Sequence, residues 1–271
     1  MESVYVDTVI LSDLHLGSEM SRAQHALALL QSLRFRRLIL LGDIFCDLNF
    51  RRLTKSHWRF LGYIRKLSNP KRGIQVVWVE GNHDHGLSQV MSHLVGIPVY
   101  QQFVWEYAGK RHIAIHGHQF DRFVINNRFL SQIGQWIFLQ LQKLDHRGQR
   151  LVRCLDRLNS RWLRLTAKVA QGALSYAKQG KAERIFCGHT HIAAHLERDG
   201  VAYFNTGGWV DARCTYITVS PEGVQIHEFH SDERADHRDP GQEREPVAAA
   251  PVGVALPPGL PADAALQSIR C

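Results

Sequence analysis

The sequence contains little cysteine, and its cysteines form no recognisable motif. Its 271 residues include five cysteines, an odd number, at widely spaced positions and without a CxxC pair. This spacing argues against a disulfide framework and against a zinc knuckle. We therefore expect a reduced chain located in the cytoplasm.

Long apolar runs are also missing. No stretch approaches the roughly 20 uncharged apolar residues that a membrane-spanning helix needs. The first thirteen residues are typical of a strand with acidic side chains, and they lack the basic and then apolar order of a signal peptide. The sequence thus predicts neither a membrane-spanning helix nor a secreted protein.

Acidic residues are too few to balance the basic ones. The chain has 33 Lys and Arg against 25 Asp and Glu, a net charge of +8. Such a surplus predicts an anionic partner, which could be nucleic acid, an anionic membrane face or a phosphorylated substrate. The alternative is an ordinary basic surface. The 45% hydrophobic content suffices for one large core, which we place in residues 1–230.

Two segments differ in composition from the rest. Residues 119–181 lack strand alternation and interleave large apolar residues with twelve bases and only three acids. We predict a helical cap inserted into the domain, suited to a membrane surface or a lipid phosphate; the alternative is a solvated helical hairpin packed on the core. Residues 231–271 are first charged and then rich in Ala, Pro, Gly and Val, which predicts a disordered tail without a catalytic part.

Five predicted strands or hairpins are each followed by a short polar motif. The strands are short apolar or β-branched runs, and apolar residues at helical spacing predict helices over 22–33 and 54–67 between them. In chain order the strands and motifs are 4–11 with Asp13-Leu14-His15, 37–41 with Gly42-Asp43, 75–80 with Gly81-Asn82-His83-Asp84, the hairpin 103–115 with His116-Gly117-His118, and 184–187 with Gly188-His189-Thr190-His191.

Each motif has an ordinary reading beside a functional one. Because side chains alternate along an extended segment, Asp13 and His15 should face the same side and could hold one cation. Without a metal, this motif would be an exposed loop. Asp43 would be a helix N-cap. The motif at 81–84 would be an ordinary turn, and the motif at 188–191 would be a packed loop.

Seven side chains of these motifs offer nitrogen or oxygen to a metal. No thiolate is among them, which favours Mn²⁺, iron or Zn²⁺ over Cu⁺. Seven ligands exceed one site and suit two ions that share Asp43. Two such ions can hold a hydroxide and clamp the attacking and leaving oxygens of a phosphoester. His83 could donate a proton to the leaving oxygen or bind a phosphate oxygen. The seven ligands are Asp13, His15, Asp43, Asn82, His116, His189 and His191.

The order of these motifs resembles the calcineurin-like metallophosphoesterases, over residues 4–229. The resemblance implies an α/β fold, a four-layer αββα sandwich, with the site at the strand ends. It also implies a hydrolase with two divalent metal ions, which we expect to be Mn²⁺, with iron or Zn²⁺ as alternatives. By position, Asp13, His15, Asp43 and His191 would bind one ion, and Asp43, Asn82, His116 and His189 the other. His83 matches the histidine that contacts the phosphate and assists the leaving group.

A closer resemblance is to the bacterial UDP-2,3-diacylglucosamine diphosphatase-like branch. It rests on HGHQFD at 116–121, the basic insert, and CGHTH followed by DGVAYFNTGGWVDARCT. It implies a cap that receives acyl chains and a reaction of the lipid A pathway type, in which UDP-2,3-diacylglucosamine is split to UMP and 2,3-diacylglucosamine 1-phosphate. Asn82, Arg157 and Lys168 would contact the substrate. The protein would be peripheral on the inner face of the bacterial membrane.

The sequence also departs from that branch. Cys46 stands three residues after Asp43, where the branch usually has an acid, and His118 and Gly208 stand where it usually has aspartates. Three other hypotheses therefore stay open. They are a soluble phosphodiesterase or phosphatase with the insert as scaffold, a non-catalytic interaction module of the same fold, and nucleic-acid processing. The concentration of charge in one apolar insert argues against the last, so we expect no nucleic acid.

Overall fold

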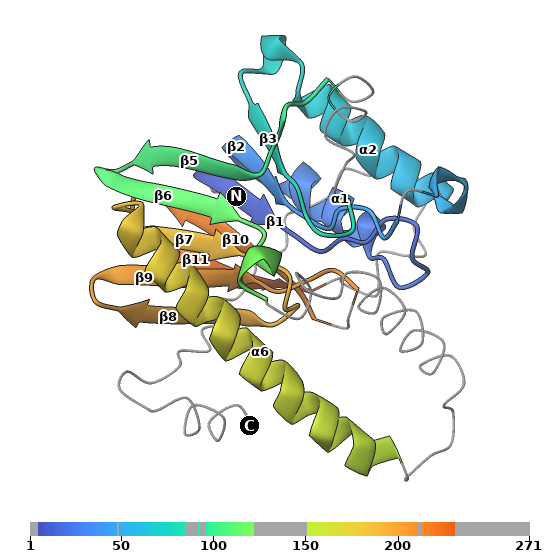
Figure 1. Ribbon diagram of the computed structural model, residues 1–271. Helices are drawn as coiled ribbons and strands as arrows, with labels where there is room; N and C mark the ends of the chain where they lie inside the picture. Colours follow the sequence, from blue (N-terminus) through green and yellow to red (C-terminus); the bar gives the residue numbers. More distant parts are fainter. Residues whose placement is uncertain are drawn as a thin grey trace.

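The computed structural model describes residues 5–47, 49–84, 92, 96–121, 151–210 and 213–230, with the backbone alone over 151–164. Two β-sheets lie face to face in this part of the chain (Figure 1). The cap residues predicted at 122–150 and the tail predicted at 231–271 lie outside the described residues.

The first sheet has six strands in the order β11-β10-β1-β2-β3-β4. Strands β1, β2, β3 and β4 run parallel, and β10 and β11 add an antiparallel hairpin at the β1 edge. The bounds are β1 Tyr5–Leu11, β2 Arg34–Leu41, β3 Gln75–Val79, β4 Val99–Tyr100, β10 Cys214–Ser220 and β11 Gly223–Phe229.

The second sheet has five strands in the order β5-β6-β7-β9-β8. Its central strands β6, β7 and β9 run parallel, and β5 and β8 pair antiparallel at the two edges. The hairpin predicted at 103–115 is present and consists of β5 and β6. The bounds are β5 Gln102–Tyr107, β6 Lys110–Ile115, β7 Arg184–Cys187, β8 Ala193–Arg198 and β9 Val201–Thr206.

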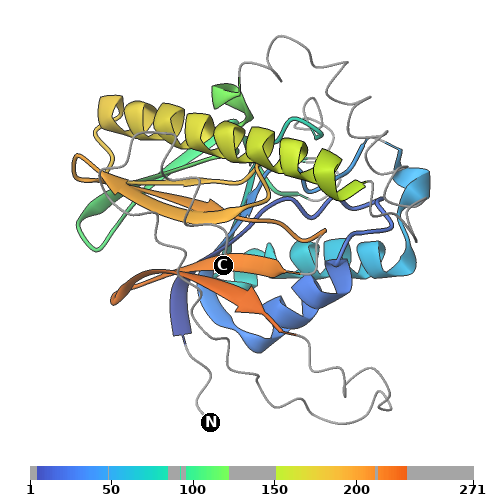
Figure 2. The same cartoon turned by 90° about the horizontal axis from the view of Figure 1, so that it is seen from below.

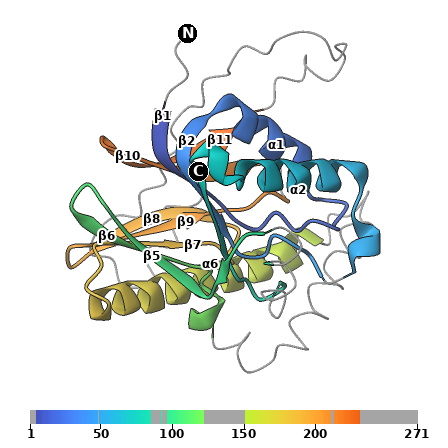
Figure 3. The ribbon, with the colours of Figure 1, turned by 90° about the horizontal axis from the view of Figure 1, so that it is seen from above.

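Helices cover the outer face of each sheet (Figures 2 and 3). Helix α1 (Ala23–Ser32) and helix α2 (Lys55–Leu67) pack side by side against the first sheet, and α6 (Leu151–Gln179) packs against the second. Three short 3₁₀ turns complete the described structure: η1 (Phe50–Arg52), η2 (Pro70–Arg72) and η3 (His118–Phe120). The predicted four-layer αββα fold is confirmed.

Three apolar layers hold the sandwich together. The middle layer fills the space between the sheets with residues such as Ile39, Val77 and Phe186. The outer layers lie under α1 and α2 and under α6. Because parallel strands buried on both faces tend to be apolar throughout, the last four residues of β2 (38–41) and of β3 (76–79) form continuous hydrophobic runs rather than alternating ones.

Part of the segment predicted as a cap packs in the core of the domain. The second half of α6 buries Val169, Ala170, Ala173 and Ala177 against the second sheet, so this part of 119–181 is an integral layer of the sandwich. The small alanines let the helix approach the sheet closely. Among the described helices, none combines the length and the apolar character needed to cross a membrane.

Candidate metal centre

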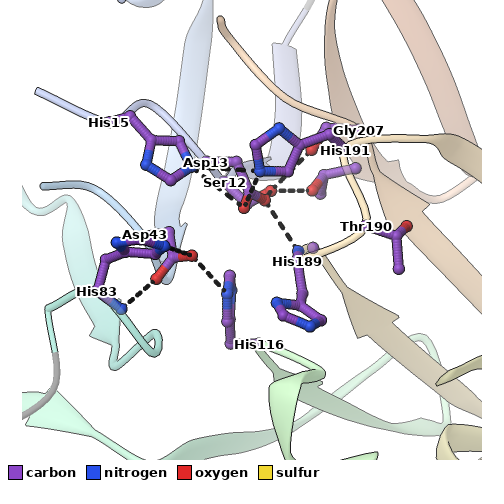
Figure 4. A network of polar contacts seen from close by, with 12 residues as sticks. Ser12, Asp13, His15, Asp43, His83, His116, His189, Thr190, His191 and Gly207 are labelled. Carbon is purple, nitrogen blue, oxygen red and sulfur yellow. Dashed lines mark hydrogen bonds and ion pairs between the residues drawn. The ribbon is translucent and has the colours of Figure 1, made fainter. Parts of the chain in front are cut away.

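The polar motifs converge because the strands that precede them are parallel. Strands β1, β2 and β3 of one sheet and β6, β7 and β9 of the other all carry their motifs at their carboxyl ends. In α/β sheets this edge is where ligands bind. Figure 4 shows the result, with histidines and aspartates from both sheets directed toward one another.

A first group contains Asp13, His15 and His191, which come from the β1 and β7 ends. The His15 Nε2 and His191 Nε2 atoms lie 3.2 Å apart, and the His191 Nε2 and Asp13 Oδ1 atoms are also 3.2 Å apart. The third side, from His15 Nε2 to Asp13 Oδ1, measures 3.9 Å. Ligands of one ion at about 2.1 Å lie about 3.0–3.4 Å from each other, so this triangle fits a single metal ion with little adjustment.

A second group contains Asp43, His116 and His189, with ligand atoms all within 4.8 Å of one another. The Asp43 Oδ2 atom lies 3.2 Å from His116 Nε2. The other carboxylate oxygen of Asp43, Oδ1, accepts a hydrogen bond of 2.8 Å from the His83 amide. Six of the seven predicted ligands thus fall into two groups of three, and Asn82 directly precedes His83.

The backbone at these motifs differs from the prediction. Asp13 and His15 have φ angles of 53° and 47°, and Asp43, His189 and His191 also have positive φ. The expectation that Asp13 and His15 lie on an extended segment is therefore wrong. The left-handed conformation is uncommon for residues other than glycine, although Asp and His adopt it more readily than most. Such strain concentrates at functional sites, where it turns side chains inward.

Two glycines allow the strand ends to approach so closely. A Cβ atom at Gly42 would overlap the His116 ring, and one at Gly81 would overlap the amide nitrogen and Oδ1 of Asp43. Gly42 also has a φ angle of 80°. Neither position accepts a side chain without moving a candidate ligand.

Further contacts orient the second group. The His116 Nδ1 atom donates to the Leu41 carbonyl at 2.9 Å, which directs Nε2 toward Asp43. The His189 Nε2 atom lies 3.3 Å from the buried Asp121 carboxylate, which leaves Nδ1 for a metal. Partners of this kind fix the ring orientation and raise the basicity of ligating histidines.

The carboxylate of Asp84 holds the loop of Asp43 from behind. It accepts hydrogen bonds from the backbone of Gly81 at 2.5 Å, Ile44 at 3.0 Å and Asp43 at 3.4 Å. Burial and the charge of Asp43 raise the pKa of Asp84 to about 6. Neither Asp84 nor Asp121 was among the predicted site residues, although Asp84 ends the GNHD motif and Asp121 ends HGHQFD.

The protonation states suit metal binding. Burial favours the neutral form of both aspartates, but His191 keeps the pKa of Asp13 below its ordinary value, and His116 and His83 do the same for Asp43. Burial lowers the pKa of His15 to about 3, with help from His191, so this imidazole is neutral. Burial opposes a charge on His116, yet Asp43 raises the pKa of His116 to about 10. A metal ion beside Asp43 would compete with that proton.

Unpaired atoms in the same place support a bound cation. Buried side-chain atoms rarely lack a hydrogen-bond partner. Within the described ranges, the buried Asn82 Oδ1 atom has none, and the buried Asp13 Oδ1 and His116 Nε2 atoms meet only other candidate ligands, His191 and Asp43, each at 3.2 Å. All three belong to predicted ligands, and oxygen and imidazole nitrogen suit Mn²⁺, iron or Zn²⁺. The residues present therefore fit the divalent ions that the motifs imply.

His83 is oriented by backbone rather than by an acid. Its Nδ1 atom lies 2.9 Å from the Cys46 carbonyl oxygen, which can only accept, so Nδ1 carries the proton. The Nε2 atom is then the nitrogen free to exchange a proton, 4.0 Å from Asp43 Oδ2. The main-chain carbonyl of Cys46 is thus the group that orients the His83 ring.

A family model supports this reading of the motifs. The model of the calcineurin-like phosphoesterase superfamily domain matches residues 6–222. The chain belongs to the calcineurin-like phosphoesterase superfamily. The family binds divalent metals, and the two groups of ligands lie where its metal site is expected. A comparison with curated proteins finds no match.

Several solved structures are similar to this one at low sequence identity. A phosphoesterase from E. coli, YfcE, is 18% identical over 80% of this chain and 90% of its own, with a TM-score of 0.43. An archaeal phosphodiesterase is 13% identical over 82% and 98%, with a TM-score of 0.45. A Vps29 from Entamoeba histolytica complexed with zinc is 14% identical over 82% and 90%, with a TM-score of 0.43.

The predicted substrate contacts lie outside the two groups. Lys168 is exposed on α6, next to Val169, which packs beside Gly117 of the His116 loop. Arg157 lies about three turns before Lys168 on the same helix, and its side chain is not described. Both remain predictions.

Proposed function

We propose that this protein is a hydrolase of phosphoesters or phosphoanhydrides that uses two divalent metal ions, with Mn²⁺ as the first candidate. The observation that carries the proposal is the pairing of the two groups, Asp13–His15–His191 and Asp43–His116–His189, at one edge of the sandwich. One ion would need only three or four of these side chains. Bound ions would supply charge stabilisation and an activated water or hydroxide.

Asp43 is the residue proposed to be shared between the ions. One of its oxygens faces His116 in the second group and the other accepts from the His83 amide. Its charge also acts on His15 and Asp13 of the first group. We assign Asn82 to the second ion, because its buried Oδ1 lacks any other partner in the described structure.

His83 is proposed to give a proton to the leaving oxygen. Its Nδ1–H is held by the Cys46 carbonyl, and its ring meets that of His15 edge-on at 5.1 Å between centroids. The Nε2 atom is therefore the only ring nitrogen left to act on a substrate. A proton donor fixed in this way contributes about 10²–10⁴-fold to a rate.

For the substrate we propose a nucleotide-linked lipid, UDP-2,3-diacylglucosamine, which would be cleaved to UMP and 2,3-diacylglucosamine 1-phosphate. Support comes from the motif resemblance and from the basic, apolar composition of residues 119–181. Arg157 and Lys168 would contact phosphate, and the protein would be a cytoplasmic enzyme peripheral to an anionic membrane surface. The second half of α6 is a core layer, so any acyl chains would lie over residues N-terminal to it.

Two other functions have support of their own. A soluble phosphodiesterase or phosphatase is favoured by the packing of α6, which makes part of the insert plain scaffold. A non-catalytic interaction module of the same fold is favoured only by departures such as Cys46, because the ligand groups themselves are complete.

The test is a direct comparison of substrates with Mn²⁺ present. We expect UMP release from UDP-2,3-diacylglucosamine in detergent to exceed hydrolysis of bis-p-nitrophenyl phosphate and of cyclic nucleotides. Asp43→Asn should be inactive, whereas Asp199→Asn, which changes an exposed carboxylate far along the chain, should be fully active. Activity on the simple diesters alone would refute the lipid substrate, and a protein without bound or activating metal would refute the hydrolase.

A further inference from the structure

Residues 49–74 form a basic stripe that contains no acid. The segment runs through η1, α2 and η2, and all of its bases are exposed. The chain as a whole has about three acids for every four bases, so a stretch of this length without an acid is a local feature. The bases of the stripe are Arg51, Arg52, Lys55, Arg59, Arg65, Lys66, Lys71 and Arg72.

Helix α2 divides cleanly into a buried and an exposed face. Its apolar face packs Phe60, Leu61, Ile64 and Leu67 into the core beneath the first sheet. At 100° per residue, the opposite face is centred on Gly62. Lys55, Lys66 and Arg59 lie within about 60° on one side of Gly62, and Trp58 and Arg65 lie within about 60° on the other.

The centre of the exposed face is open. Nothing lies within 4 Å of the position that a Cβ atom of Gly62 would occupy. Beside it, the Trp58 side chain is 55% exposed, the most exposed large apolar side chain but one among the described residues. No carboxylate of the described chain forms an ion pair with Lys55, Arg59 or Lys66, whereas Arg52 pairs with Asp47.

We propose that this exposed face of α2 docks on an anionic lipid bilayer. Clusters of four to eight Lys or Arg bind anionic headgroups, and tryptophan prefers the interface between headgroups and acyl chains. The face is the convex outer side of a helix, and nothing covers Gly62 at its centre. A broad planar surface can therefore lie against it. A nucleic-acid partner would instead call for bases that line a groove. The inference does not depend on the reaction proposed above.

The helix that carries this face contacts a loop of the metal centre. His57, buried on α2, accepts a hydrogen bond of 3.2 Å at Nδ1 from the Gly17 amide, two residues after His15. The η1 turn lies against the same loop, because the Arg52 side chain would be 3.7 Å from a Cβ atom at Gly17. In Figures 1 and 2, α2 lies on the outer side of its sheet, opposite α6. Docking through α2 would therefore use a surface distinct from the predicted cap, on the helix that contacts the loop after His15.

The test is co-sedimentation of the full-length, metal-loaded protein with vesicles. Vesicles of phosphatidylcholine are compared with vesicles that also contain phosphatidylglycerol. We expect binding to the anionic vesicles only, weakened by salt. The variant Lys55→Gln/Arg59→Gln/Lys66→Gln should bind about 100-fold more weakly, since each base near the surface contributes about 1 kcal/mol and 1.4 kcal/mol is tenfold. Trp58→Ala should weaken binding further by a smaller factor.

A matched control removes the same charge elsewhere. Lys110→Gln/Arg111→Gln/Arg198→Gln alters three exposed bases of β6 and β8 and should bind almost as the wild type does. Equal loss in both triple variants would mean a response to net charge alone and would overturn the proposal. Unchanged vesicle binding by the α2 variant would also overturn it. So would a variant that loses binding to duplex DNA while its binding to vesicles persists.

Circular dichroism and a thermal melt show whether each variant is folded. Hydrolysis in detergent, measured in parallel, separates a failure of docking from a failure of the proposed reaction.

Discussion

The two ligand groups differ in how firmly the protein holds them. In the second group, His116 is fixed by the Leu41 carbonyl, His189 by Asp121, and the loop of Asp43 by Asp84. In the first group, the His15 Nδ1 atom has no hydrogen-bond partner in the described structure, and the His191 side chain is 22% exposed. The same residue types thus occupy a braced group and a looser one.

This difference predicts two metal affinities. A ligand that is already oriented loses less freedom on binding, so a preorganised group binds an ion more tightly. We expect the ion at Asp43, His116 and His189 to bind first and to leave last, and the ion at Asp13, His15 and His191 to exchange more readily. The predictions below test that ranking, from the largest effect to the smallest.

Asp43→Asn should have the largest effect, because Asp43 is the candidate shared ligand. The substitution removes the charge that faces His116 and acts on both groups. We expect no measurable turnover and a loss of metal from both sites, measured by elemental analysis after gel filtration. Retention of one full equivalent of metal would mean that Asp43 serves a single ion and that the groups are independent.

His83→Ala should separate proton transfer from metal binding. The His83 ring is held by the Cys46 carbonyl, and its Nε2 atom lies 4.0 Å from Asp43 Oδ2. We expect the rate to fall by about 10²–10⁴-fold while both ions remain bound. His83→Gln, which keeps a polar side chain without a titrating nitrogen, should behave similarly. Loss of metal from either variant would show that His83 is itself a ligand.

The sequence predicted the parts of this molecule that depend on strand polarity. Buried runs such as 38–41 and 76–79 are apolar throughout, and parallel strands place their ends at one edge, so the convergence of Asp43 and His116 followed from pattern alone. The left-handed backbone at Asp13 and His15 did not follow, because alternation assumes an extended chain.

Contacts that depend on distance between loops were also beyond the sequence. Nothing near Asp121 or Asp84 in the chain indicates that one reaches His189 and the other caps the backbone of Ile44. The contact between His83 and the Cys46 carbonyl could not be predicted from the sequence, since every residue has a carbonyl. The packing of α6 could not be predicted for a related reason: nothing in the sequence of its alanine-rich turns indicates that a sheet lies against them.

Asp121→Asn tests the bracing of the second group directly. The amide still fills the space but no longer offers a charge to His189 Nε2. We expect the affinity of the tighter ion to fall by about 10–100-fold, the usual loss for such a partner. Calorimetric titration with Mn²⁺ measures it, and Asp199→Asn, an exposed carboxylate paired only with Lys178, serves as the control. If the tighter ion kept its affinity and the looser ion lost affinity, the proposed ranking of the two groups would be wrong.

Thr206→Val should have the smallest effect and should be confined to the first group. The Thr206 hydroxyl contacts Ser12, whose own hydroxyl contacts Asp13 Oδ2, and it donates to the Cys187 carbonyl at 3.2 Å. Its loss should cost about 1 kcal/mol of folding free energy in urea denaturation. Thr218→Val removes a buried hydroxyl that pairs with His227 at 2.7 Å, remote from either group, and should cost a similar amount. Only Thr206→Val should also weaken the looser ion, because only that hydroxyl supports a ligand. An equal effect of both variants on metal affinity would mean that the first, looser group responds to global stability rather than to the orientation of Asp13.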